Sequence, residues 1–292
     1  MITICNDKLK VSINENGGSM CSIMKNGIEY QWQGSKESWE GQDVVIFPFV
    51  ARLKDGFYLY EDKKYELLTH GLCRYTKLDI LEKGPSFVTM SLKWNEETLK
   101  RYPYKFEFYL KYSIDNETLK VEYKVKNVDD KTIYFGLGGH PAFSLPYERK
   151  NGIDEIDGNY IEFEKPLNLA NYMLEETGCF IVGKENFGEV SKIELNKALF
   201  EKYNTIMLTG AKFSSLKLVR KDGVSIKMDV SDFPILALWT KPKLGAYICI
   251  EPWTSIPDMN YPNRELKVKP TIQSLDVNQE KTYSYTIQIW ID

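Results

Sequence analysis

Apolar and polar residues alternate with a period of two along much of this 292-residue chain. In residues 104–114 the apolar and aromatic side chains share one face: Tyr104, Phe106, Phe108, Leu110, Tyr112 and Ile114. Residues 119–125 repeat the pattern with Leu119, Val121, Tyr123 and Val125. Such alternation is typical of half-buried strands. Because the turn sequence Asp-Asn-Glu-Thr separates the two runs, we expect them to form a hairpin.

Similar short runs, rich in β-branched and aromatic residues, predict further strands at 85–94, 214–220, 224–231, 235–240, 246–253 and 283–291. Helical patterns are limited to a turn or two at 35–42 and a short helix at 196–203. No repeat, low-complexity tract or linker divides the chain. The pattern therefore predicts an all-β protein with few short helices, folded as one domain over 1–292 in a single large antiparallel β-sandwich of two packed sheets.

Composition narrows the classes of function. Hydrophobic residues make up 43% and charged residues 27% of the chain, which excludes a disordered chain and a membrane bundle. A net charge of −3 does not indicate the positively charged surface that binds nucleic acid or an anionic membrane. A small uncharged or modestly charged ligand fits better. The N-terminus lacks the features of a signal peptide and no long apolar run is present, which predicts a cytoplasmic protein.

The cysteines and acidic residues give no metal motif. The five cysteines are odd in number, widely spaced and never in a CxxC pattern: Cys5, Cys21, Cys73, Cys179 and Cys249. This spacing argues against a disulfide scaffold and a structural zinc site, and favours reduced thiols. No dense Asp/Asn loop predicts calcium. We therefore expect neither a metal nor a cofactor.

Four segments interrupt the strand pattern: 47–58, 67–75, 136–143 and 248–258. The third contains His140, one of only two histidines. Gly138 and Gly139 allow backbone conformations closed to other residues and the close approach of a ligand, while Pro141 restricts His140 to extended geometry. One interpretation is a structural histidine bonded to the backbone. The rigid setting favours a proton donor or acceptor instead.

Glu251 follows an apolar strand directly before a proline, where partial desolvation raises a carboxyl pKa and suits a general base. Its alternative is a buried glutamate neutralised by an arginine. Trp239 and Trp253 are either core residues or an apolar platform for the C–H face of a sugar. His70, Arg52 and Arg74 each have a structural and a functional interpretation: a solvated turn residue or surface cation, or part of the same site.

Taken in order, the four segments resemble the aldose 1-epimerase (galactose mutarotase-like) family, and within it the shorter LacX-like branch. The resemblance is carried by "FPFVARLKDGFY", "THGLCRY", the hairpin that leads into "GGHPAF", and "ICIEPWTSIPD". It implies a large antiparallel β-sandwich that interconverts the α and β anomers of an aldose. His140 then matches the general acid on the ring oxygen and Glu251 the base on the anomeric hydroxyl, and we expect the two to face opposite edges of the sugar. His70 matches a second histidine near the ring oxygen, and Arg52 a substrate-binding arginine.

One departure concerns the substrate. The "GYDH"-like segment of galactose mutarotases, which supplies an aspartate to sugar hydroxyls, is absent, and Asn204 is the nearest counterpart by position. Arg74 has the spacing of an arginine in sugar-phosphate members, and with Arg52 or Lys54 it suits a 6-phosphate. The sequence thus leaves three hypotheses: an epimerase of a free hexose, a hexose-6-phosphate 1-epimerase, and a non-catalytic carbohydrate-binding or sensor protein. For each the partner is a small-molecule sugar, and the chain is expected to be a monomer or weak homodimer.

Overall fold

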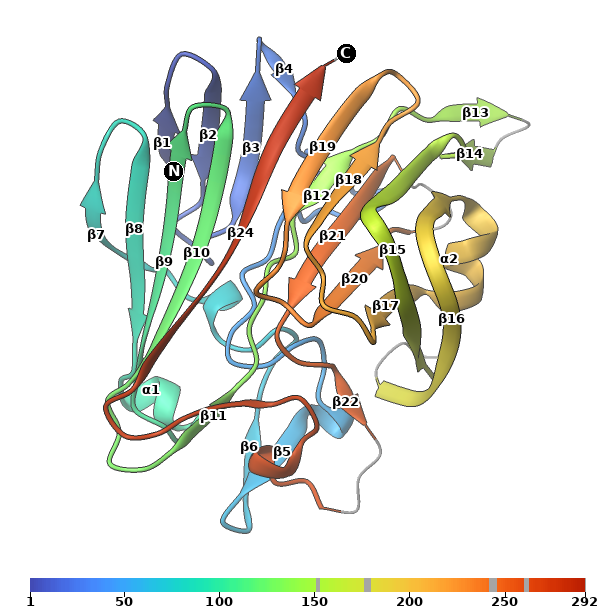
Figure 1. The fold of residues 1–292 in the computed structure, drawn as a ribbon. Coiled ribbons are helices and arrows are strands. Elements are labelled where there is room, and N and C mark those ends of the chain that lie inside the picture. The colour runs from blue at the N-terminus through green and yellow to red at the C-terminus, as the bar shows by residue number, and fades with distance from the viewer. Residues whose placement is uncertain (151–152, 176–179, 242–245, 260–262, 292) are drawn as a thin grey trace.

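The computed structural model describes residues 1–150, 153–175, 180–241, 246–259 and 263–291. Over these residues the chain forms twenty-four strands and two short α-helices (Figure 1). The largest sheet has fourteen strands, and its pairs are antiparallel except for one short parallel pair. The predicted all-β fold is confirmed. The prediction of one domain over 1–292 stays a prediction.

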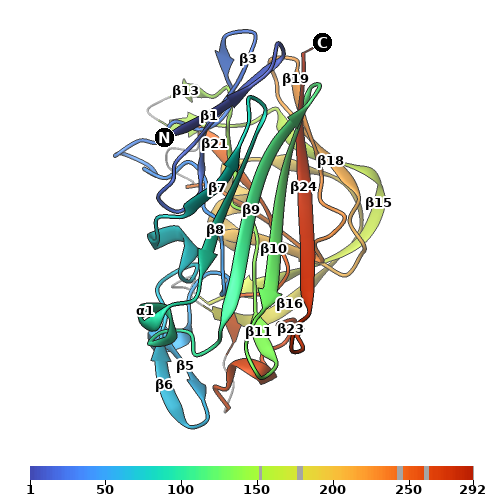
Figure 2. The same ribbon diagram turned by 90° about the vertical axis from the view of Figure 1, so that its left-hand side faces the viewer.

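The expected hairpin builds one half of the large sheet. Its strands are β9 (Phe106–Asp115) and β10 (Thr118–Asn127), and Val121 pairs with Tyr112. Beside them lie β8 (Phe87–Lys93), β7 (Asp79–Lys83) and β24 (Glu280–Ile291), which together form the left-hand wall of Figure 1 and face the viewer in Figure 2. Inward-facing residues of β9 and β10 are buried at every second position, as the period-two pattern predicts.

The other half of the sheet carries the cavity described below. Its strands, in order from β24, are β19 (Val224–Asp229), β18 (Ser215–Val219), β15 (Asn159–Leu174), β17 (Thr205–Thr209), β20 (Ile235–Trp239), β21 (Tyr247–Trp253) and β12 (Ala142–Ser144). A ribbon is added by β16 (Phe180–Leu195) on β15, with β22 (Asp258–Met259) beside it. Because β19 pairs with β24, the two expected layers are halves of one hydrogen-bonded sheet. Side chains from both halves meet in a single large hydrophobic core.

Smaller elements close the edges. They are the sheet of β1 (Ile2–Cys5), β2 (Leu9–Ile13), β3 (Met20–Lys25) and β4 (Ile28–Glu29), and the pairs β5 (Phe57–Tyr60) with β6 (Lys63–Glu66), β11 (Ile133–Phe135) with β23 (Gln273–Leu275), and β13 (Glu148–Lys150) with β14 (Ile153–Glu155). The expected short helix is α2 (Lys197–Tyr203), and α1 (Glu96–Leu99) was not predicted. Residues 35–42 form a turn closed by Ser35 N–H donating to the Trp39 carbonyl at 2.9 Å, and no helix.

Four of the five cysteines lie within the described residues, and all four are free thiols: Cys5, Cys21, Cys73 and Cys249. The expectation of reduced cysteines is met for these four, whereas Cys179 lies outside the described residues. None of the described helices has the length and apolar character needed to cross a membrane.

Candidate active site

His140 and Glu251 face each other because of strand register. The register is set by the pairs on either side, Gly138 with Trp253 and Ala142 with Cys249. Midway between these two pairs, His140 on one strand lies opposite Glu251 on the other. Directly opposed side chains on one face of an antiparallel pair lie close together. The histidine of the glycine-rich segment and the glutamate of β21 are therefore cross-strand neighbours, although β12 itself begins only at Ala142.

The same row continues across the next two strands. Ala237 of β20 pairs with Glu251, and Met207 of β17 pairs with Ala237. Since the side chain of Ala237 is only a methyl group, it leaves space above the sheet next to Glu251. A cavity of about 400 Å³, a volume typical of small-molecule sites, opens over this face.

All eight residues singled out from the sequence line this one cavity: Arg52, His70, Arg74, His140, Asn204, Trp239, Glu251 and Trp253. They come from parts of the chain as far apart as the loop before β5 and the strand β21. The structure therefore brings the predicted site together, while the roles assigned to its residues stay predictions. Lys54, weighed with Arg74 for phosphate binding, does not line it and contributes to a separate small cavity.

The side chains of His140 and Glu251 are in polar contact. His140 Nε2 lies 3.2 Å from Glu251 Oε2, and their side chains are 9% and 1% exposed. Burial lowers the pKa of His140 to about 3. Burial, followed by the charge of Asp43, raises the pKa of Glu251 well above its ordinary value. Both shifts favour the uncharged forms, so the pair shares one proton that resides on the carboxyl group.

The pair has unmet hydrogen-bonding capacity. His140 Nδ1 and Glu251 Oε2 are buried and have no hydrogen-bond partner among the described residues. The 3.2 Å contact thus lacks the alignment of a hydrogen bond. Buried polar groups left unpaired are costly, and a ligand with hydroxyl groups would satisfy them.

Aromatic rings surround His140. Trp39 lies 5.1 Å from its ring, His70 5.5 Å and Trp239 5.8 Å, between ring centroids. Trp253 is 3% exposed and packs in a small hydrophobic cluster, whereas Trp239 is half-buried at the cavity wall. Of the two tryptophans proposed as a sugar platform, Trp239 therefore presents more surface to a ligand.

The second histidine has a defined tautomer. Ala51 N–H donates to His70 Nδ1 at 3.2 Å, and His70 N–H donates to the Ala51 carbonyl at 2.8 Å. Because Nδ1 accepts, the ring proton is on Nε2, which makes that atom a donor. Burial is the main cause that lowers the pKa of His70 well below its usual value. The alternative of a solvated turn histidine is wrong, since His70 is 8% exposed.

The cations of the cavity are Arg52, Arg74 and Lys241. Among the described residues that line it, Glu251 is the only acidic one, and burial favours its uncharged form. Three cationic side chains therefore line the cavity in the described part of the chain. Asn204 reaches the cavity from the C-terminus of α2, where its φ is 58° and its ψ is −60°.

Three residues of the site escaped the sequence analysis. Trp39 and Lys241 line the cavity, and Lys241 Nζ donates to the Ser38 carbonyl, which joins the two segments. Asp43 is buried behind His140 and accepts from the backbone N–H of His140 at 3.3 Å and of Met20 at 2.9 Å. Burial raises the pKa of Asp43 to about 6. Nothing in the residue types of these three or in the sequence around them indicated that they belong to the site.

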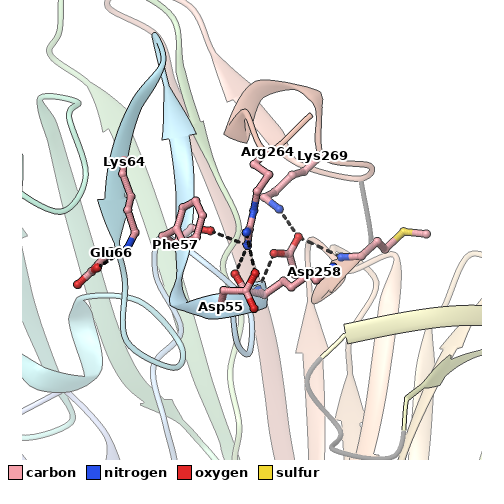
Figure 3. A network of polar contacts seen from close by, with 9 residues as sticks. Asp55, Phe57, Lys64, Glu66, Asp258, Arg264 and Lys269 are labelled. Carbon is pink, nitrogen blue, oxygen red and sulfur yellow. Dashed lines mark hydrogen bonds and ion pairs between the residues drawn. The ribbon is translucent and has the colours of Figure 1, made fainter. Parts of the chain in front are cut away.

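A network of polar contacts anchors the loop that carries Arg52 (Figure 3). Asp258 accepts from Lys269 and from the backbone N–H of Lys54, the latter at 2.8 Å. Arg264 donates to Asp55 at 2.9 Å and stacks over the Phe57 ring. The segment after β21 is thereby tied to the start of β5, next to the cavity.

Glycine is required at positions 138 and 139 for a different reason from the predicted one. Neither has a positive φ, so the expectation of a conformation closed to other residues is wrong. A Cβ on Gly138 would lie 2.4 Å from the Pro252 carbonyl oxygen, and one on Gly139 2.8 Å from the Tyr285 hydroxyl. The glycines allow close packing against β21 and the core.

Replacing Gly138 by alanine is therefore expected to lower the free energy of unfolding by about 1–3 kcal/mol, because backbone and not a flexible side chain blocks the added methyl group. Thermal or urea unfolding measures the change. Gly183→Ala is the matched control, since its Cβ would meet only the end of the Met173 side chain, at 3.0 Å. Equal effects of the two substitutions would show that the close approach to β21 is unimportant.

Comparisons with known proteins show the family of the chain. The model of the aldose 1-epimerase family matches residues 1–290. Protein LacX (plasmid) of Lactococcus lactis subsp. lactis is 30% identical over 299 residues, covering 98% of this chain and 99% of that protein.

Solved structures give the same result. A galactose mutarotase related enzyme of Lactobacillus acidophilus is 28% identical with a TM-score of 0.91, covering 99% of this chain and 97% of the other. A galactose mutarotase-like protein of Lactobacillus casei ATCC 334 is 26% identical with a TM-score of 0.92, covering 99% and 100%. The extent and strength of these matches establish that the chain belongs to the aldose 1-epimerase family.

Proposed function

We propose that this protein interconverts the α and β anomers of a hexose, with Glu251 and His140 as the proton-transferring pair. The observation that carries the proposal is the 3.2 Å contact between His140 Nε2 and Glu251 Oε2 at the wall of a cavity. Membership of the family supports an isomerase acting on carbohydrates. The lining residues and the volume fit a single sugar ring.

The spacing of the pair suits the two oxygens that react. Ring opening removes a proton from the anomeric hydroxyl and delivers one to the ring oxygen, and both oxygens are bonded to the same carbon. The sequence interpretation placed the two groups at opposite edges of the sugar. Adjacent groups, 3.2 Å apart, meet geminal oxygens more directly.

One shared proton is enough for the whole cycle. Ring opening starts when the shared proton passes from Glu251 to His140, which then protonates the ring oxygen while Glu251 takes the proton of the anomeric hydroxyl. The C1–C2 bond then rotates, and closure on the other carbonyl face reverses the two roles. Each positioned acid or base contributes typically about 10²–10⁴-fold to the rate. His70 Nε2–H, held as a donor by Ala51, is placed to bind a sugar oxygen.

The test is anomer exchange followed by polarimetry or NMR, with freshly dissolved glucose, galactose and other hexoses. We expect at least one sugar to equilibrate much faster than in buffer. If the protein binds sugars and no sugar in a broad panel equilibrates faster, the hypothesis of a non-catalytic carbohydrate-binding or sensor protein replaces this one. A protein that only binds sugar has no need of an adjacent acid and base.

A second candidate is a hexose-6-phosphate 1-epimerase, and the cationic side chains in the cavity favour it. Arg52, Arg74 and Lys241 all line the cavity. A guanidinium binds phosphate through paired, charge-assisted hydrogen bonds.

For this candidate, kcat/KM is expected to be higher for a hexose 6-phosphate than for the free hexose, and Arg74→Ala is expected to reduce that preference by about 10–100-fold. The reason is the loss of one charged hydrogen-bonding group from the cavity. Rates of anomer exchange with matched phosphorylated and free sugars give the ratio. Arg101→Ala, at an exposed site away from the cavity, is the control. An unchanged ratio in Arg74→Ala would contradict a phosphate-binding role of Arg74, and a wild-type ratio below one would assign the activity to free hexoses.

A further inference from the structure

Cys249 has no part in the proposed reaction, yet it lies beside the reacting pair. It precedes Glu251 by two residues on β21, so both side chains point to the same face. Its pairing with Ala142 makes His140 its diagonal neighbour across the strands. The thiol is fully buried and does not line the cavity. It therefore lies beside the pair on the same face, in a small cluster against which Trp39 and Trp239 pack.

The side chains of His140, Cys249 and Glu251 bring a nitrogen, a sulfur and an oxygen atom close together as possible metal ligands. One ligand atom from each of His140, Cys249 and Glu251 can be chosen so that all lie within 4.8 Å of one another. Two of the polar atoms, His140 Nδ1 and Glu251 Oε2, are buried without a hydrogen-bond partner among the described residues. Strand register thus assembles a donor set that sequence spacing concealed, because His140 is distant from the other two in the chain.

This donor set selects the kind of cation. Imidazole, thiolate and carboxylate are the ligands of Zn²⁺, which takes three protein ligands and leaves a fourth position open. Ca²⁺ and Mg²⁺ prefer oxygen ligands alone. When Zn²⁺ binds, the Cys249 thiol and the Glu251 carboxyl each release a proton to water. The dication is then balanced by two anions, so the buried complex carries no net charge.

Access and support for such a site are also present. His140 and Glu251 line the cavity, which gives an ion a path to them, and the buried Cys249 lies next to Glu251 on the same face of β21. Asp43 fixes the backbone of His140 through its N–H. The Trp39 and Trp239 rings flank the imidazole and limit its movement.

We propose that His140, Cys249 and Glu251 form a zinc-binding site at the wall of the cavity, and that bound Zn²⁺ blocks the sugar reaction. The block follows because the ion takes atoms of the two groups that would exchange protons with the sugar. Zinc binding stands on the geometry alone, whereas the inhibition rests on the proposed epimerase function.

The experiment uses the untagged full-length protein with Zn²⁺ in calorimetric titration and Co²⁺ as a spectroscopic probe. We expect one equivalent of metal to bind, with the absorption band of a cobalt–thiolate bond. Cys249→Ala is expected to lose that band and to weaken zinc binding by at least about 10-fold. Cys249→Ser, which keeps the size of the side chain, should do the same if the alanine variant folds poorly. Cys5→Ser is the control, since Cys5 is an exposed thiol.

Anomer exchange in the presence of Zn²⁺ tests the second part of the proposal, that zinc blocks the sugar reaction. Zinc should inhibit the wild-type protein, and in Cys249→Ala the inhibiting concentration should rise by at least about 10-fold while the zinc-free rate stays close to wild type. Absence of the cobalt–thiolate band, or equal zinc affinity in wild type and both Cys249 variants, would overturn the site. Zinc binding without any epimerase activity would leave the site standing and remove the proposed function.

Discussion

Replacing Glu251 by glutamine is expected to slow anomer exchange by about 10²–10⁴-fold. Glutamine keeps the size and the hydrogen-bonding oxygen of the side chain, but it cannot take up and return a proton. KM should change little, because the loss lies in the transition state and not in binding. The measurement is kcat and KM for the best sugar of the panel.

Two controls separate this loss from a loss of structure. Glu251→Gln should leave the free energy of unfolding at neutral pH unchanged or higher, because burial raises the pKa of the Glu251 carboxyl and an ionised carboxylate is costly there. The sign follows from linkage: the folded state holds the proton more tightly, so the glutamate costs more stability as pH rises above the unfolded pKa. His140→Gln combined with Glu251→Gln should cost about as much activity as either change alone, since the pair acts as a unit. A fully additive loss would contradict a shared proton.

The largest effect on stability is expected at Asp258. Asp258 and Lys269 form a contact between side chains that are 2% and 7% exposed, and burial lowers the pKa of Lys269 while Asp258 partly offsets this. Asp258→Ala leaves a buried ammonium group without its carboxylate. The expected loss is about 3–5 kcal/mol of the free energy of unfolding, measured by urea denaturation.

Figure 3 also contains the matched control. Lys64 and Glu66 form an ion pair at 2.8 Å whose side chains are 53% and 73% exposed, and Glu66→Ala should cost at most about 1 kcal/mol. The double variant Asp258→Leu with Lys269→Met should recover much of the stability, because apolar residues replace the pair. A loss at Asp258 no greater than at Glu66 would show that the buried pair does not anchor this side of the cavity.

How far the sequence predicts the fold depends on how regular each strand is. In β10 the alternation of buried and half-exposed residues is unbroken, and the hairpin with β9 was predicted with nearly correct bounds. Along β15 and β16, by contrast, the register shifts between Glu162 and Leu167 and twice more. In β15 the buried positions keep their alternation, but they include Asn159 and Asn171 and are interrupted by the exposed residues 164–166, so the apolar period-two pattern is weak and these long strands were missed.

The residues of the candidate site also fall into those that the sequence predicted and those that it missed. The residues with unusual local sequence, such as His140 between glycines and proline, were found from the chain alone. Trp39 and Asp43 were not, because their contacts with His140 join segments distant in sequence. The relative placement of His140 and Glu251 was also beyond reach. It depends on the register of β21 with the strand opposite, and that register makes them neighbours and not partners across a sugar ring.

The most direct measurement of the central claim is NMR magnetisation transfer between the α and β anomeric protons of one sugar, with wild type beside Glu251→Gln at equal concentration. The account predicts rapid exchange with the wild-type protein and exchange near the buffer rate with the variant. Equal exchange rates for the two proteins would contradict the assignment of Glu251 and His140 as the proton-transferring pair.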